Sequence, residues 1–138
     1  MNRVWKLALA GMLAALAASS MAGGIKWSAN LAAALKLAKK SHKPVMVDFY
    51  GDSCGSCRML DDRTYPDKSV VQFARGVVPV KIEYTRQPRL IEKYGIQETP
   101  TIMFLDQNGK MIGYFTGFHP PAEFLAESAK ILKKQKSK

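Results

Sequence analysis

Two cysteines, Cys54 and Cys57, are the only ones in this 138-residue chain, and they are three positions apart. An apolar run rich in valine and aromatic residues precedes them at residues 45–50 and has the composition of a buried strand. Residues 51–53, Gly-Asp-Ser, interrupt that run, and a pattern that suits a helix continues after the cysteines. The sequence therefore predicts a strand that delivers two thiols to the first turn of a helix.

The first turn of a helix is a favourable place for a thiolate. Its unpaired backbone N–H groups and the positive end of the helix dipole stabilise the anion. Cys54 lies at the mouth of the predicted helix, so we expect it to be the exposed, attacking thiol. Cys57 lies about one turn further in, within reach to close a disulfide. Reversible redox chemistry is the favoured interpretation.

Three other uses of a Cys-x-x-Cys pair were weighed. A structural disulfide is disfavoured, because such a short loop contributes little stability. A zinc site needs four ligands, but there is no second Cys-x-x-Cys, and His42 and His119 stand alone in predicted loops. A two-coordinate copper(I) site stays open as an alternative, because soft thiolates suit that ion.

The first 22 residues have the pattern of a secretory signal. Arg3 and Lys6 are followed by an apolar run at residues 7–18 and by small residues at Ser20 and Ala22. The run is shorter than the roughly 20 residues that span a bilayer. We expect residues 1–22 to be a cleaved signal, with an uncleaved anchor as the alternative, and residues 23–138 to form a single domain in the periplasm or another extracytoplasmic space.

The chain is strongly basic, with 21 Lys and Arg against 11 Asp and Glu and a formal charge of +10. Without residues 1–22, which hold Arg3, Lys6 and no acidic residue, 19 basic and 11 acidic side chains remain, a charge of +8. Lysines cluster at residues 36–43 and 133–138 without interleaved aromatics, so we expect solvated faces, with weak adhesion to anionic membranes as an option and no nucleic-acid partner. Nothing in the sequence indicates an obligate interface, and a monomer is expected.

The order of elements predicts an α/β fold with a mixed sheet flanked by helices on both faces. Asn108-Gly109 is a strong signal for a two-residue hairpin between the last two strands. The predicted strands cover residues 45–50, 77–84, 102–106 and 111–116. The predicted helices cover residues 29–40 with Ser28 as N-cap, 54–63, 69–75, 89–94, and a last one that starts at Pro120-Pro121.

Two separated motifs carry a resemblance to a known family. The strand residues 47–50 before Cys54-Gly55-Ser56-Cys57, with Thr99-Pro100-Thr101 far downstream, resemble the thioredoxin superfamily over essentially all of residues 23–138. Residues 43–48, 64–67 and 114–118 further resemble the exported thioredoxin-like domain at the C-terminus of DsbD, the membrane thiol:disulfide interchange protein. The resemblance implies the thioredoxin fold.

The resemblance also implies catalytic roles. Cys54 would attack a substrate disulfide, and Cys57 would resolve the mixed disulfide. Asp48 would be a buried carboxylate whose raised pKa suits it to take the proton from Cys57; a solvent-exposed strand-end aspartate is the alternative. Asp61, one turn after Cys57, matches an acidic residue that modulates the cysteines in the DsbD-like domain, and a merely solvated helix position is equally compatible.

Partner binding would use the loops that face the cysteines. Pro100 matches the cis-proline of this fold, and the backbone of Thr99 would then pair with an extended partner strand. Ser53 stands where the family commonly has tryptophan, and Gly55-Ser56 replaces Gly-Pro between the cysteines. A hydroxyl at Ser56 would favour the reduced form by hydrogen bonding to a thiolate, which makes the pair more oxidising.

The function expected from these features is thiol–disulfide exchange in the cell envelope, as a reductant rather than an oxidant. The expected partners are disulfide-bearing exported proteins and a membrane thiol reductase that supplies electrons. No cofactor or metal is expected beyond the Cys54–Cys57 disulfide. A copper(I)-handling module and an oxidant of secreted proteins are the alternatives.

Overall fold

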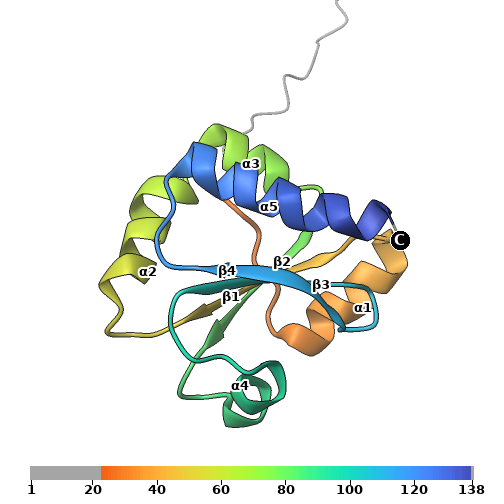
Figure 1. Ribbon diagram of the computed structural model, residues 1–138, viewed down its shortest axis with the longest axis horizontal. Coiled ribbons are helices and arrows are strands. Elements are labelled where there is room, and N and C mark those ends of the chain that lie inside the picture. The colour runs from red at the N-terminus through yellow and green to blue at the C-terminus, as the bar shows by residue number, and fades with distance from the viewer. Residues whose placement is uncertain (1–22, 138) are drawn as a thin grey trace, which may run out of the picture.

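The computed structural model describes residues 23–137 of the chain (Figure 1). The predicted signal at residues 1–22 lies outside this range. None of the helices in the described range combines the length and the apolar character that crossing a membrane requires. In chain order the elements are α1 Leu31–Ser41, β1 Val45–Tyr50, α2 Gly55–Met59, the π-helical turn η1 Leu60–Thr64, α3 Lys68–Ala74, β2 Val78–Glu83, α4 Pro88–Tyr94, β3 Thr101–Leu105, β4 Met111–Thr116 and α5 Pro121–Lys136.

The four strands form one mixed sheet in the order β2-β1-β3-β4. β1 and β2 are parallel, because α2, η1 and α3 carry the chain back across the sheet between them. β3 runs antiparallel to β1, and the hairpin at residues 106–110 returns the chain as β4, also antiparallel. Figure 1 views the sheet edge-on, with α3 and α5 on one face and α1 and α4 on the other. The predicted α/β architecture is confirmed.

β1 is the central strand and is buried from Val45 to Phe49. Because side chains alternate along a strand, Val45, Val47 and Phe49 face the α1 and α4 side, while Met46 and Asp48 face the α3 and α5 side. Two apolar cores follow, one on each face of the sheet. A carboxylate thus points into the second core, next to the end of the strand that leads to the cysteines.

Two predicted helices begin or end elsewhere than expected. α1 starts at Leu31 and is capped by Asn30, whose Oδ1 accepts from the N–H of Ala33 at 2.8 Å. The predicted cap, Ser28, instead donates its N–H to the carbonyl of Pro79 at 2.8 Å, because it lies along the exposed edge of β2. The helix predicted over residues 54–63 is found at residues 55–64, but it divides into α2, which ends at Met59, and a π-helical turn that ends at Thr64.

The packing of α5 on β4 gives a stability prediction at Gly113. A Cβ at this position would lie 2.9 Å from Cγ2 of Ile131, and a β-branched side chain in a helix has little freedom to move away. We expect Gly113→Ala to lower the free energy of unfolding by about 1–3 kcal/mol in a urea titration. Gly24→Ala is the matched control, because nothing lies within 4 Å of its Cβ position. If the contact is the cause, Ile131→Ala should remove most of the cost in the double variant; additive effects would contradict it.

Candidate active site

Cys54 and Cys57 are joined by a disulfide at the start of α2. Cys54 is the N-cap of this helix, and its sulfur accepts the backbone N–H of Cys57 at 3.1 Å. Cys54 is half-buried, whereas Cys57 is only 4% exposed. The accessible sulfur is therefore the one that receives the N–H, and the same bond would stabilise a thiolate on Cys54 after reduction.

Ser56 lies between the two cysteines, and its hydroxyl is 3.7 Å from the sulfur of Cys54. A hydroxyl at this distance from sulfur is able to donate to a thiolate. The Ser56 hydroxyl thus lies beside the accessible Cys54 and not beside the buried Cys57, as the sequence interpretation requires.

The loop at Thr99 and Pro100 lies against the cysteine loop. The peptide bond between these two residues is cis, and the carbonyl of Pro100 accepts the N–H of Gly117 at 3.0 Å. A Cβ at Gly51 would be 3.4 Å from Oγ1 of Thr99 and 3.6 Å from Cβ of Cys54, so only a small residue fits between the two loops. An open groove of about 470 Å³ results, lined by residues 51–56, 83–85 and 99. The predicted substrate-binding residues Ser53, Gly55, Ser56 and Thr99 all line this groove, whereas Pro100, the next residue after Thr99, is buried and does not line it.

Asp48 is buried on the other side of the cysteines, with 1% of its side chain exposed. The hydroxyl of Tyr65 donates to its Oδ2 at 2.8 Å, and Nζ of Lys81 lies 3.8 Å from the same oxygen. Burial raises the pKa of Asp48 to about 6, against the opposing effects of the Lys81 charge and the Tyr65 hydrogen bond. The solvent-exposed alternative for Asp48 is wrong. The sequence predicts burial and a raised pKa but neither of the two partners that reach Oδ2.

The two oxygens of Asp48 have different surroundings. No described residue hydrogen-bonds to Oδ1, although that atom is buried. Burial and the nearby Asp48 raise the pKa of Tyr65 well above its usual value, so the phenol keeps its proton and acts as the donor. Oδ2 is thereby occupied, and Oδ1 is left as the oxygen on which a proton can be held or released.

Lys81 connects the buried carboxylate to the surface. Its ammonium forms an ion pair with Asp61, whose side chain is 46% exposed. The ammonium also lies 5.2–5.3 Å from the centres of three aromatic rings, those of Trp27, Tyr50 and Tyr65. Asp61 therefore shares its cation with Asp48, and its role in modulating the cysteines stays a prediction.

Three residues of this network were not identified as functional from the sequence. Tyr65 was noted only as part of the resemblance at residues 64–67. Lys81 had a usable signal, because it is a single cation inside an apolar strand, but its role depends on the register that pairs it with Asp48 across β1 and β2. Trp27 precedes the first helix in an extended segment, and nothing in its local sequence points to the cysteines.

The histidines do not join the cysteines. His42 is the C-cap of α1 with a φ of 55°, and His119 lies in the loop between β4 and α5. Within residues 23–137, no group of three or more His, Cys, Asp or Glu side chains is arranged to hold a metal ion. The two-coordinate copper(I) alternative at Cys54 and Cys57 involves fewer side chains than such a group and stays open.

Comparison with known proteins agrees with this geometry. A family model described as a thioredoxin-like domain matches residues 31–132. The thiol:disulfide interchange proteins DsbD of Vibrio vulnificus (strain CMCP6) and Pseudoalteromonas atlantica are 33% and 35% identical over 103 and 104 residues. These alignments cover 70% and 71% of this chain but only 17% and 18% of the relatives, so the chain spans less than a fifth of their length.

Solved structures agree on the fold. A structure described as DsbH oxidoreductase matches with a TM-score of 0.73 at 22% identity, covering 82% of this chain and 88% of its own. The oxidised C-terminal domain of Neisseria meningitidis DsbD matches with a TM-score of 0.60 at 24% identity, covering 72% and 90%. The predicted thioredoxin fold is confirmed. With its family model over residues 31–132, its relatives and a disulfide at the start of α2, this chain belongs to the thioredoxin-like family.

Proposed function

We propose that this protein reduces disulfides of exported proteins in the periplasm or another extracytoplasmic space. The observation that carries the proposal is the half-buried Cys54 sulfur, which lies at the start of α2 and beside a groove that ends at Thr99. The reducing direction is inferred from the resemblance to the electron-relaying C-terminal domain of DsbD, and the pattern of residues 1–22 favours export.

In the first step, the Cys54 thiolate attacks one sulfur of the partner's disulfide. A bond forms between Cys54 and that sulfur, and the partner's second sulfur leaves as a thiolate. The N–H of Cys57 and the hydroxyl of Ser56 stabilise the Cys54 thiolate before attack. An extended partner segment lies in the groove and pairs with the backbone of Thr99, behind which Pro100 fixes the loop.

In the second step, Cys57 resolves the mixed disulfide. The ionised Asp48 accepts the proton of the Cys57 thiol, and the resulting thiolate attacks the sulfur of Cys54. The Cys54–Cys57 disulfide forms and the partner's first sulfur leaves as a thiolate, so two electrons have passed to the partner. Protons from Asp48 and solvent complete its two thiols. Asp61 modulates this step through the Lys81 ammonium that it shares with Asp48.

A reductant in an oxidising compartment must be recharged. Disulfides persist in such compartments, so the oxidised Cys54–Cys57 pair needs a dedicated electron source. A membrane thiol reductase is the proposed donor, and a monomer with one groove would meet donor and substrate in turn.

Trapping of partners tests the proposal in cells. With Cys57→Ala, the first step still occurs but the mixed disulfide has no resolving thiol, so we expect disulfide-linked adducts on non-reducing gels that disappear with dithiothreitol. The double variant Cys54→Ala/Cys57→Ala is the control and should give none. Adducts with exported proteins are the expected result, whereas adducts that form equally through Cys57 in a Cys54→Ala variant would contradict the assigned order of attack.

A copper(I) titration separates the remaining alternative. If the protein is a reductant, we expect no stoichiometric uptake of copper(I) that depends on both cysteines under conditions where it reduces disulfides. A tight, cysteine-dependent copper(I) site without disulfide reduction would instead identify a copper-handling module.

A further inference from the structure

The end of the sheet opposite Cys54 brings together segments that are far apart in sequence. Val45 starts β1 and pairs with Val78, the first residue of β2, and with Leu105, the last of β3. The C-terminal end of α1, the turn between α3 and β2, and the hairpin between β3 and β4 therefore meet at this end of the molecule (Figure 1).

α5 also ends there. Near its start, the ring of Phe124 lies 5.4 Å from that of Phe115 in β4. Two turns later, Ile131 packs on Gly113, which precedes Phe115 in the same strand. The helix thus runs antiparallel to β4, and its last turn extends toward Met111, where the strand begins.

Basic side chains gather at this end, which we call the basic end. Two of the helices that terminate here carry lysines in their last turns. The only carboxylate of the hairpin, Asp106, accepts backbone N–H groups of Asn108 and Lys110. By contrast, the segments nearer the Cys54 end hold carboxylates as well as cations; Asp52, for example, pairs with Arg86. The basic end comprises Lys39, Lys40, Lys43, Arg75, Lys110, Lys133, Lys134 and Lys136.

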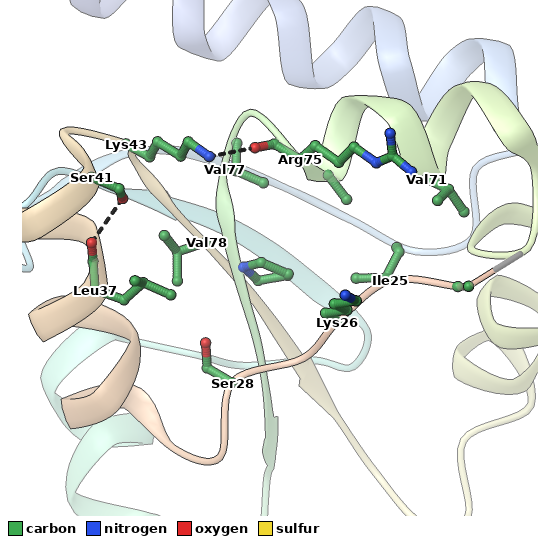
Figure 2. Close-up of a pocket in the computed structure, with 14 residues that line it drawn as sticks. Ile25, Lys26, Ser28, Leu37, Ser41, Lys43, Val71, Arg75, Val77 and Val78 are labelled. Carbon is green, nitrogen blue, oxygen red and sulfur yellow. Dashed lines mark hydrogen bonds between the residues drawn. The ribbon is translucent and has the colours of Figure 1, made fainter. Parts of the chain in front are cut away.

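A cleft of about 500 Å³ opens at the basic end beside β2 (Figure 2). Its floor is apolar, formed by side chains that include Val71, Val77 and Val78, and Leu37 at its edge is 49% exposed. Three cations line it as well: Lys26, Arg75 and Lys43, whose Nζ donates to the carbonyl of Arg75 at 2.8 Å. None of the described residues that line the cleft is acidic.

We propose that the basic end rests on an anionic phospholipid surface, with headgroup phosphates at the cations of the cleft. Several basic residues close to one plane attract such a surface, and the apolar floor suits the part of a lipid below its phosphate. Single-stranded nucleic acid is a poorer match, because it needs aromatic platforms and the basic residues here are not interleaved with them.

The connection to the preceding residues agrees with this orientation. Gly23 and Gly24 line the same cleft, so in the uncleaved-anchor alternative the apolar run at residues 7–18 would precede the end of the domain that faces the bilayer. The cysteines would then face the aqueous space, where soluble partners approach. The proposal requires access to a bilayer and does not depend on the direction or chemistry of thiol exchange.

Hydrogen exchange of the full chain on vesicles tests the proposal. The comparison is between vesicles that contain phosphatidylglycerol and neutral phosphatidylcholine vesicles, so that any insertion of residues 1–22 is common to both. We expect protection of the ends of α1 and α5 and of the α3–β2 turn on the anionic vesicles only, and its loss in 0.5 M salt, where the Debye length is below about 8 Å.

A matched pair of triple variants gives the control. Lys40→Gln/Lys133→Gln/Lys134→Gln should lower the charge-dependent part of vesicle partitioning by about 100-fold, since each basic residue near an anionic surface contributes about fivefold. Arg63→Gln/Lys68→Gln/Arg89→Gln removes the same amount of charge from positions outside the basic end and should lower this partitioning by less than threefold. Equal losses in both variants, no protection on anionic vesicles, or equally tight, salt-sensitive binding of an oligonucleotide would overturn the proposal.

Discussion

Replacing Cys54 by alanine is expected to abolish reduction of a protein disulfide, with a rate loss of at least about 10³-fold. The reason is the location of the Cys54 sulfur. Cys54 has the accessible sulfur and receives the N–H of Cys57, whereas Cys57 is 4% exposed and cannot reach a partner's disulfide without rearrangement. The measurement is turnover of insulin or another disulfide substrate with dithiothreitol as electron source.

Two controls accompany the Cys54 experiment. Lys68→Ala changes an exposed residue of α3 and should leave turnover within a factor of two. The urea midpoint of Cys54→Ala should match that of the reduced wild-type protein, which separates lost chemistry from lost folding. Turnover that survives in the folded Cys54→Ala variant would show that another group attacks the substrate.

Replacing Asp48 by asparagine is expected to change stability and activity in opposite directions. The pKa of Asp48 is about 6 in the folded protein against an ordinary value of 3.8, so folding favours its protonated form. Its stabilising contribution is therefore complete below pH 3.8 and lost as the pH rises through about 6. Above that, the buried charge costs about 3 kcal/mol, and Asp48→Asn should recover about 2 kcal/mol of unfolding free energy at pH 8.

The same variant should react more slowly. Asparagine cannot accept the proton of the Cys57 thiol, so resolution of the mixed disulfide should slow by about 10²-fold. In the wild-type protein this step should lose rate as the pH falls below about 6, and that acid limb should be absent in Asp48→Asn. A stabilised variant with unchanged resolution would contradict the role in proton transfer and leave only a structural one.

The variant Tyr65→Phe tests in which direction the acid limb of the resolution rate moves along the pH axis. Removal of the 2.8 Å hydrogen bond to Oδ2 takes away an interaction that lowers the pKa of Asp48, so the acid limb should move to higher pH. Lys81→Met should move it the same way, because the Lys81 charge also lowers this pKa. Tyr114→Phe, an exposed tyrosine on β4, should leave the limb in place.

The sequence predicted the parts of the site that depend on local order. The strand, the cysteines and the start of a helix are contiguous, so Cys54 at the N-cap followed from composition and spacing. Asn108-Gly109 likewise predicted the hairpin, but the predicted two-residue loop is wrong: residues 106–110 connect β3 to β4, and only Gly109 has the positive φ that a two-residue Asn-Gly turn requires at both positions.

The parts that depend on register and long-range packing could not be predicted in this way. Lys81 reaches Asp48 only because the parallel pairing of β1 and β2 places them side by side, across 33 positions of sequence. Tyr65 reaches the same oxygen only because a π-helical turn shifts the chain after α2. Ser28 is a residue whose local sequence led to a wrong prediction. Its side chain suits a helix cap, but its backbone N–H donates to the carbonyl of Pro79 at the edge of β2 instead.

The most direct test of the proposed reductant is the equilibrium of the Cys54–Cys57 pair in a glutathione redox series. We predict a potential near that of thioredoxin, about −270 mV, shifted upward by the hydroxyl of Ser56 but still reducing relative to the exported disulfides that the protein serves. A potential near that of DsbA, about −120 mV, would contradict the account and identify the protein as an oxidant.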